Sequence, residues 1–420
     1  MTALAPGASS LPPLPTDGRL RPREDGLAEA YLPAPTVQSH AANLAVLAGG
    51  DLGCVWFGGT QEGVADVSIW FSHLPVGGDS WSQAVRLSDD PTRSEQNPIL
   101  FPAPTGDLWL LWTAQHAGDQ DTAVVRARVS RDDGTTWGPV RELLSSPTGG
   151  IFVRQPPVVL PGGRWLLPTF ACVRVDGARW VGDADTSSVW FSDDEGLTWT
   201  EAPVPGSTGC VHMNIVPLSD GTLAAWYRSR WADRVYRSTS ATGLDWSEPV
   251  ATELPNNNSS IQAVALGGGR VAMVLNESSR LDAVARRVSL YDEIDDGGVV
   301  DAPPDAQAPD SAKGAAGDLG PDVEGAPRRA FWGAPRAPMT LALSADDGRS
   351  WPVHCVLAEG DGYALSNNSR DGVNRELSYP SVVPGAGGGL DVAFTHHRRA
   401  IRHVRIPAAA VAEHLAQHGG

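Results

Sequence analysis

The chain has 420 residues, a formal net charge of −17 and only 19% charged residues. This acidic balance argues against nucleic acid and anionic membranes as partners, although a locally basic site could still bind an acidic ligand. No apolar run approaches the ~20 residues that a membrane-spanning helix needs. Met1–Asp25 lacks the apolar core of a signal peptide, so we expect a cytoplasmic protein with no membrane partner.

The predicted elements begin with an N-terminal tail, residues 1–30, in which a strand near Arg19–Leu32 could close a ring of sheets. Residues 31–420 predict a single domain of short strands, because 46 glycines and 34 prolines suit many tight turns. Six pairs of apolar strands follow one another: Ala41–Leu47 with Cys54–Phe57, Ile99–Pro102 with Leu108–Trp112, Pro157–Leu160 with Trp165–Pro168, Asn214–Leu218 with Leu223–Tyr227, Ile261–Leu266 with Val271–Leu275, and Pro380–Val383 with Leu390–Thr395. The last pair is followed by one more clear strand, Ile401–Ile406.

One turn motif recurs between these pairs. The pattern Ser-x-Asp-x-Gly-x-Thr-Trp occupies Ser130–Trp137 and Ser192–Trp199, returns with Ser for Thr at Ser344–Trp351, and has a worn copy ending at Trp246. In such Asp-box turns the aspartate bonds backbone amides, the glycine permits a positive φ, and the tryptophan fills the gap between sheets. One such hairpin per repeat of roughly 50–60 residues is typical of a β-propeller. The sequence therefore predicts an all-β fold, a six-bladed β-propeller with Asp-box turns.

Residues 292–328 interrupt the repeats. The stretch is acidic, rich in Pro, Ala and Gly, and has no apolar periodicity. It predicts a long mobile loop inside blade five, joining the second strand of that blade to the third.

The predicted topology sorts residues between two rims. The Asp-box turns join third to fourth strands on one rim, whereas the loops before first strands and after second strands lie on the other. The polar residues expected on that second rim are His40, Glu62, Asp66, Asn97, Arg154, Gln155, His212, Asn214, Arg228, Asn258, Gln262, Asn276, Arg336, Glu376, Tyr379 and His396. Convergence of titratable groups around one axis indicates a candidate active site.

The Asp-box turns and the six-fold repeat resemble the sialidase (neuraminidase) superfamily, specifically bacterial proteins with BNR-type repeats. The resemblance covers nearly the whole chain after about Tyr31, and the phrases WFGGTQEG, PNNNSS and ELSYPS look like those of a sialidase-like subgroup. It implies a covalent mechanism in which three arginines hold a sugar carboxylate. A tyrosine paired with a glutamate is then the nucleophile, and an aspartate is the acid/base.

Three residues match positions of that pattern. Tyr379, in the triplet Ser-Tyr-Pro, opens the last blade at the nucleophile position. Arg228, at the end of AWYR, matches one carboxylate-binding arginine, and Arg336, shortly before the Asp-box turn of blade five, matches another. The match implies that the site binds an acidic sugar. The expected partner is therefore an acidic oligosaccharide or a polysaccharide fragment.

Three positions depart from the pattern. His40 stands where the family has its first-blade arginine, and His212 stands where it has the glutamate of blade four. The acid/base loop carries Gln61-Glu62 in place of an aspartate. Two histidines on the axis could do acid/base work near neutral pH.

The leading interpretation is an exo-acting, sialidase-like glycoside hydrolase that releases an acidic sugar from a glycan end. Tyr379 would attack the anomeric carbon, and Glu62 or a histidine would protonate the leaving oxygen. The phenol needs a neighbouring base, for which Glu376 and His212 are the candidates, since free tyrosine has a pKa of about 10. The substrate-binding residues are expected to be Arg228, Arg336, Arg154, Gln155, Asn214, Asn258 and Gln262.

Two alternatives remain open from the residues. One is a polysaccharide lyase in which arginines acidify the α-proton of a uronic acid and His40, His212 and Tyr379 supply base and acid. The other is a non-catalytic glycan-binding propeller. No cofactor is expected, no metal is expected because no third ligand has clear spacing, and the residues do not indicate an oligomeric state.

Overall fold

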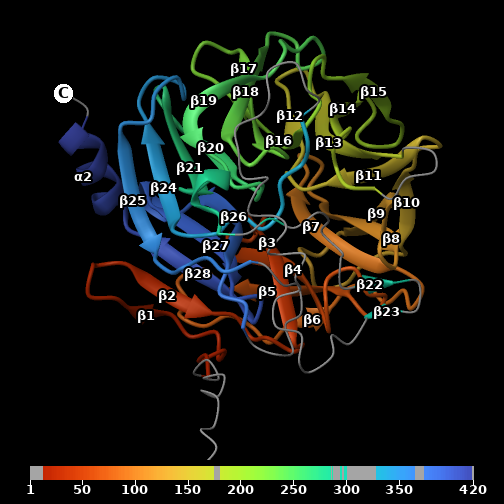
Figure 1. The fold of residues 1–420 in the computed structure, drawn as a ribbon. Helices are drawn as coiled ribbons and strands as arrows, with labels where there is room; N and C mark the ends of the chain where they lie inside the picture. The colour runs from red at the N-terminus through yellow and green to blue at the C-terminus, as the bar shows by residue number, and fades with distance from the viewer. Residues whose placement is uncertain are drawn as a thin grey trace, which may run out of the picture.

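The computed structural model describes residues 13–174, 180–284, 286, 294–295, 298–299, 328–364 and 373–418. In these residues six antiparallel sheets surround a common axis, as Figure 1 shows. The protein is a six-bladed β-propeller, and the fold class predicted from the turn motif is confirmed.

The first three blades follow the chain. Blade one contains β3 (Gln38–Val46), β4 (Leu52–Gly59), β5 (Ser68–Leu74) and β6 (Val85–Arg86). Blade two contains β7 (Ser94–Pro102), β8 (Leu108–His116), β9 (Asp119–Ser130) and β10 (Arg141–Leu144). Blade three contains β11 (Gly149–Val153), β12 (Val158–Val159), β13 (Trp165–Val173), β14 (Thr186–Ser192) and β15 (Thr200–Pro203). Its innermost strand is split into β11 and β12, which both pair with β13.

The next two blades repeat this arrangement. Blade four contains β16 (Cys210–Pro217), β17 (Leu223–Ser229), β18 (Arg234–Ser240) and β19 (Val250–Pro255). Blade five contains β20 (Gln262–Gly267), β21 (Arg270–Asn276), β24 (Met339–Ser344) and β25 (Val353–Ala358). Between β21 and β24 lie the 3-10 helix η1 (Arg280–Asp282) and the hairpin of β22 (Ile294–Asp295) and β23 (Gly298–Val299). Most of the stretch 292–328, predicted as an insertion, lies outside the described residues.

Blade six joins the two ends of the chain. It contains β26 (Leu377–Pro384), β27 (Leu390–His396) and β28 (Ala400–Ile406), with the 3-10 turn η3 (Ala386–Gly388) between the first two. The N-terminal strand β2 (Ala28–Tyr31) pairs with β28, and β1 (Arg21–Pro22) pairs with β2. This pairing closes the ring and covers the edge of β28. The C-terminal helix α2 (Ala408–His418) follows, and no described helix is long and apolar enough to span a membrane.

Aromatic side chains fill the gaps between neighbouring blades. The indole of Trp137, from the turn of blade two, lies against Phe71 of blade one with ring centroids 6.4 Å apart. The indole of Trp351, from the turn of blade five, lies against Trp226 of blade four at 5.9 Å. Burial of such large apolar surfaces stabilises the ring, because a single blade cannot cover both of its own faces.

The turn from Ser192 to Trp199 shows which hydrogen bonds stabilise the motif. Asp194 accepts hydrogen bonds from the Thr198 amide at 2.8 Å and from the Thr198 hydroxyl at 2.6 Å. The hydroxyl of Ser192 donates to Asp194 at 2.8 Å and accepts from the Gly196 amide at 2.8 Å. Gly196 has a φ of +82°, a left-handed value that glycine adopts without strain. The bonds from Thr198, with that from Ser192, lower the pKa of Asp194 to about 2.

Asp194→Ala is expected to lower the melting temperature by a few degrees without changing turnover, because the turn lies on the rim opposite the candidate site. Since the folded pKa of Asp194 is depressed, its stabilising contribution is present above the ordinary pKa and is lost as the pH falls through about 2. Thermal melts and kinetics of the purified variant check this. Asp193→Ala is the matched control, because Asp193 makes only an exposed ion pair with Arg164. Lost turnover at an unchanged melting temperature would contradict the assignment of rims.

Candidate functional site

The innermost strand of each blade is interrupted at the level of the candidate site. In β3, β7, β16 and β26 the register with the second strand slips by one residue at a bulge. In blade three the inner strand breaks between β11 and β12, and in blade five β20 begins only at Gln262. Bulges re-aim side chains and are common beside active sites.

Five residues at these interruptions have a left-handed backbone. They are Ala41, Asn97, His212, Asn258 and Tyr379, with φ values between +49° and +60°. Such values are uncommon for residues other than glycine and cost free energy that the surrounding structure must offset. The sequence predicted these positions at strand starts, whereas the structure places four of them inside longer strands.

Tyr379 lies at the centre of the site. Its hydroxyl accepts a hydrogen bond from Nη1 of Arg228 at 2.7 Å. The Nε atom of Arg228 donates to Oδ1 of Asn258 at 2.7 Å, so Asn258 orients the guanidinium rather than standing free to bind a sugar. A guanidinium at this distance favours the ionised form of the phenol over the neutral form.

The charges around Tyr379 do not balance. The guanidinium carbons of Arg154, Arg228 and Arg336 lie 5.3, 5.6 and 5.7 Å from the centre of its ring. Arg336 pairs with a carboxylate, but no carboxylate in the described part of the chain contacts Arg154 or Arg228. Burial lowers the pKa of each of these two arginines to about 10, so both stay charged near neutral pH. The site can therefore attract an anionic ligand.

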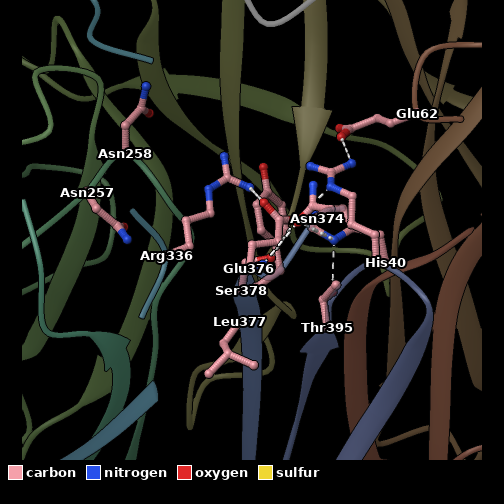
Figure 2. Close-up of polar contacts among 12 residues, drawn as sticks. His40, Glu62, Asn257, Asn258, Arg336, Asn374, Glu376, Leu377, Ser378 and Thr395 are labelled. Carbon is pink, nitrogen blue, oxygen red and sulfur yellow. Dashed lines mark hydrogen bonds and ion pairs between the residues drawn. The ribbon is translucent and has the colours of Figure 1, made fainter. Parts of the chain in front are cut away.

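A chain of ion pairs borders Tyr379. Glu376 accepts from Arg336 at 3.0 Å and from Arg398 at 2.6 Å, and Arg398 also donates to Glu62 at 2.5 Å. Figure 2 shows Arg336 directed at Glu376, with His40 and Glu62 on the other side. Burial raises the pKa of Glu376, but Arg398 and Arg336 outweigh burial and hold it below its ordinary value. Glu376 therefore balances arginines, and its carboxylate accepts hydrogen bonds from Arg336, Arg398 and Ser378.

Glu376→Gln is expected to reduce the loss of stability on acidification. Because the folded pKa of Glu376 is depressed, its contribution is present above the ordinary pKa and is lost as the pH falls through the folded pKa. Melting temperatures measured against pH check this, with Glu201→Gln, at an exposed carboxylate on blade three, as the control. A wild-type pH dependence in Glu376→Gln would show that these ion pairs contribute nothing to acid stability.

Two neutral imidazoles flank the tyrosine. The ring centres of His40 and His212 lie 4.4 and 5.5 Å from that of Tyr379. Burial, with neighbouring arginines, lowers the pKa of both histidines well below the ordinary value. His40 contacts the Thr395 hydroxyl through Nδ1 at 2.8 Å, and Nε2 of His212 lies 3.4 Å from Nη1 of Arg228. Both rings therefore enter any reaction uncharged.

Aromatic residues cover the site. The indole of Trp332 lies 5.7 Å from the Arg228 guanidinium and meets Trp180 of blade three at 5.9 Å. Asn258 donates to the Phe331 carbonyl at 2.9 Å, which ties this segment to the site. Tyr379 itself is only 6% exposed.

Three residues predicted to bind substrate instead join the blades beneath the site. Oδ1 of Asn214 accepts the Ala263 amide at 2.5 Å, and Oε1 of Gln262 accepts the Val382 amide at 2.6 Å. Gln155 accepts from Gln262 at 2.9 Å and donates to a carbonyl of blade five at 2.6 Å. Their polar atoms are engaged in the ring itself, which corrects the expectation of a free hydrogen-bonding surface.

Arg154 is likewise engaged by the protein, through Ser260 and three backbone carbonyls. Arg398 is the important residue that the sequence reasoning missed. It was not among the residues expected on the rim, yet it is 1% exposed and bonds both Glu62 and Glu376. The position of Arg398 in the hairpin turn after β27, on the same rim as the site, is the feature of the sequence that could have indicated its role. Its two carboxylate partners come from distant segments, so the sequence alone could not pair them.

Metal ligation has no support among the described residues, because no three His, Cys, Asp or Glu side chains there are placed to hold an ion. The four cysteines are free thiols, and three of them are buried. The chemistry that this arrangement offers comes from a phenol, imidazoles, carboxylates and guanidinium groups.

Comparisons with known proteins agree with the fold. The model of the BNR repeat-like domain family matches residues 50–392. No curated protein shows a significant sequence match. Among solved structures, the Hadza microbial sialidase Hz136 is similar with a TM-score of 0.62 and 13% identity, over 89% of this chain and 66% of its own. The present chain thus spans just under two thirds of that sialidase.

Two further structures match over nearly their whole length. The intramolecular trans-sialidase from Ruminococcus gnavus, solved with oseltamivir carboxylate, has a TM-score of 0.60 and 11% identity, over 90% of this chain and 97% of its own. A protein of unknown function from Dyadobacter fermentans has a TM-score of 0.61 and 12% identity, over 94% and 99%. At such identities the likeness concerns the fold.

Proposed function

The chain belongs to the BNR repeat-like family, and from that premise we propose that it is an exo-acting, sialidase-like glycoside hydrolase releasing an acidic sugar from a glycan end. The observation that carries this proposal is the 2.7 Å contact between Arg228 and the Tyr379 hydroxyl at the propeller axis. A phenol beside an arginine without a carboxylate partner suits both a nucleophile and the binding of a sugar carboxylate.

In the proposed reaction the Tyr379 oxygen forms a bond to the anomeric carbon while the glycosidic bond to the leaving oxygen breaks. Arg228 and Arg336 would hold the sugar carboxylate, and His212, whose ring centre lies 5.5 Å from that of Tyr379, is the proposed acceptor of the phenol proton. Glu62, buried on the loop between β4 and β5, is the candidate acid for the leaving oxygen. It can donate only once its carboxylate has left Arg398 and taken up a proton. Water then cleaves the glycosyl–tyrosine bond, with Glu62 accepting the proton of the water while His212 returns its proton to the phenolate oxygen.

A polysaccharide lyase is the second candidate, and one observation favours it. Two neutral imidazoles flank Tyr379, while no described carboxylate hydrogen-bonds its hydroxyl. In an elimination the arginines neutralise a uronate carboxylate, a histidine removes the α-proton, and the phenol protonates the leaving oxygen. This reaction needs no carboxylate beside the tyrosine.

Screening acidic oligosaccharides with product mass and near-ultraviolet absorbance as readouts tests both candidates. Hydrolysis adds one water to the products, whereas elimination adds none and creates an absorbing double bond. Products without added water and without new absorbance would indicate intramolecular transfer, the activity named for the Ruminococcus structure. Binding without any product would support a glycan-binding propeller and contradict both enzyme proposals.

A further inference from the structure

We infer that Arg154 is a positioning residue, which holds left-handed segments of three blades and thereby aims Tyr379 at its reaction partner. The inference rests on the proposed function of the axial site. Arg154 comes from blade three, at the break between β11 and β12. Its contacts lie in blades one, five and six.

The hydrogen bonds of Arg154 reach the bulges of blades one and six and the segment before β20 in blade five. Nη2 donates to the carbonyl of Tyr379 at 3.1 Å and to that of Pro380 at 3.1 Å. The same nitrogen lies 3.0 Å from the carbonyl of Ala42, the residue after Ala41, so its two protons are shared among three carbonyls. Nε donates to the hydroxyl of Ser260, two residues beyond Asn258, at 3.2 Å. One guanidinium thus links the backbones that carry His40, Asn258 and Tyr379.

The clamped backbone is strained. Tyr379 has a φ of +53°, Ala41 of +60° and Asn258 of +57°. Side chains other than glycine rarely adopt such values, and they persist only where surrounding contacts enforce them. Arg154 donates a hydrogen bond to the Tyr379 carbonyl, and this bond fixes the peptide group that follows the strained φ of Tyr379. Arg154 is therefore a contact that keeps the phenol under Arg228.

The cost of burying Arg154 supports a specific role. Its side chain is fully buried, contacts no described carboxylate, and leaves Nη1 without a hydrogen-bond partner. An apolar residue of similar volume would often stabilise a fold equally well at such a position. What an apolar residue could not supply is the pair of donors Nε and Nη2, which reach a hydroxyl of blade five and carbonyls of blades one and six.

The first test needs no substrate. The chain has six tyrosines, so fluorotyrosine labelling gives six resonances, and Tyr379→Phe identifies the one from Tyr379. We expect this resonance to shift or broaden in Arg154→Met and to shift less in Arg154→Lys, which keeps the charge but loses the fork. An unchanged Tyr379 resonance in folded Arg154→Met overturns the inference. Should Arg154→Met fail to fold, the same comparison on Arg154→Lys decides.

Arg128→Met is the matched control. Arg128 also donates to three carbonyls, those of Gly138, Trp137 and Leu87, but on the rim of the turns. We expect it to lower the melting temperature while the Tyr379 resonance stays in place. A shift of that resonance in Arg128→Met as large as in Arg154→Met would show general loosening and overturn the inference.

The second test uses the substrate found by screening. Misplacement of a reacting group by about 1 Å costs about 10²-fold in rate, so kcat should fall by that order while KM stays nearly constant. A rise in KM with unchanged kcat would make Arg154 a substrate-binding residue and overturn the positioning role. If screening finds no substrate, the proposed function fails while the resonance of Tyr379 still decides the inference.

Discussion

Replacing Tyr379 by phenylalanine is expected to lower kcat by at least about 10²-fold, the usual cost of losing acid/base help. The substitution removes one oxygen and keeps the ring, whose hydroxyl bonds Arg228. The melting temperature should change little, because the ring still packs between His40 and His212. Steady-state kinetics on the substrate found by screening, together with thermal melts, measure both effects.

Tyr227→Phe is the matched control for this prediction. Tyr227 is also buried, but its hydroxyl meets Ser238 at 2.6 Å within blade four. Its loss should lower stability and leave kcat unchanged. Full activity of Tyr379→Phe would show that the reaction does not occur at the propeller axis.

The histidine variants separate the two candidate reactions. A hydrolase of the proposed kind makes Tyr379 the most damaging loss, with His40→Ala and His212→Ala milder. A lyase makes the loss of one histidine equally severe, because the imidazole then removes the proton from carbon. Because burial lowers the pKa of both rings well below the ordinary value, neither should cause an inflection of the pH–rate profile at that ordinary value.

Replacing Arg228 by lysine is expected to raise KM at least tenfold, which corresponds to about 1.4 kcal/mol. Lysine keeps the charge but loses the planar fork that bonds Asn258 and Tyr379 together and that can grip a carboxylate. Kinetics on the acidic substrate measure the change. Arg164→Lys serves as the control, because its exposed pair with Asp193 lies on the outer surface. An unaltered KM in Arg228→Lys would make Arg228 a structural residue.

The candidate site shows how far sequence reasoning extends. The histidines, Tyr379 and Arg228 were predicted to converge, and the structure brings them into contact. The carboxylate beside the phenol was expected from Glu376, but Glu376 is committed to Arg336 and Arg398. The pairing of nearby ionic groups depends on differences of a few ångströms in their distances. The spacing of residues along the sequence does not give these distances.

The sequence by itself determined the propeller, because the repeated turn is local: Ser192, Asp194 and Gly196 interact within a few residues of one another. The paired apolar segments likewise located the inner strands of the blades. Only the tertiary structure decided the bulges, which place His212 and Tyr379 inside their strands. It also decided the roles of Arg154 and Arg398, since their partners come from distant blades and the ring must close before such groups meet.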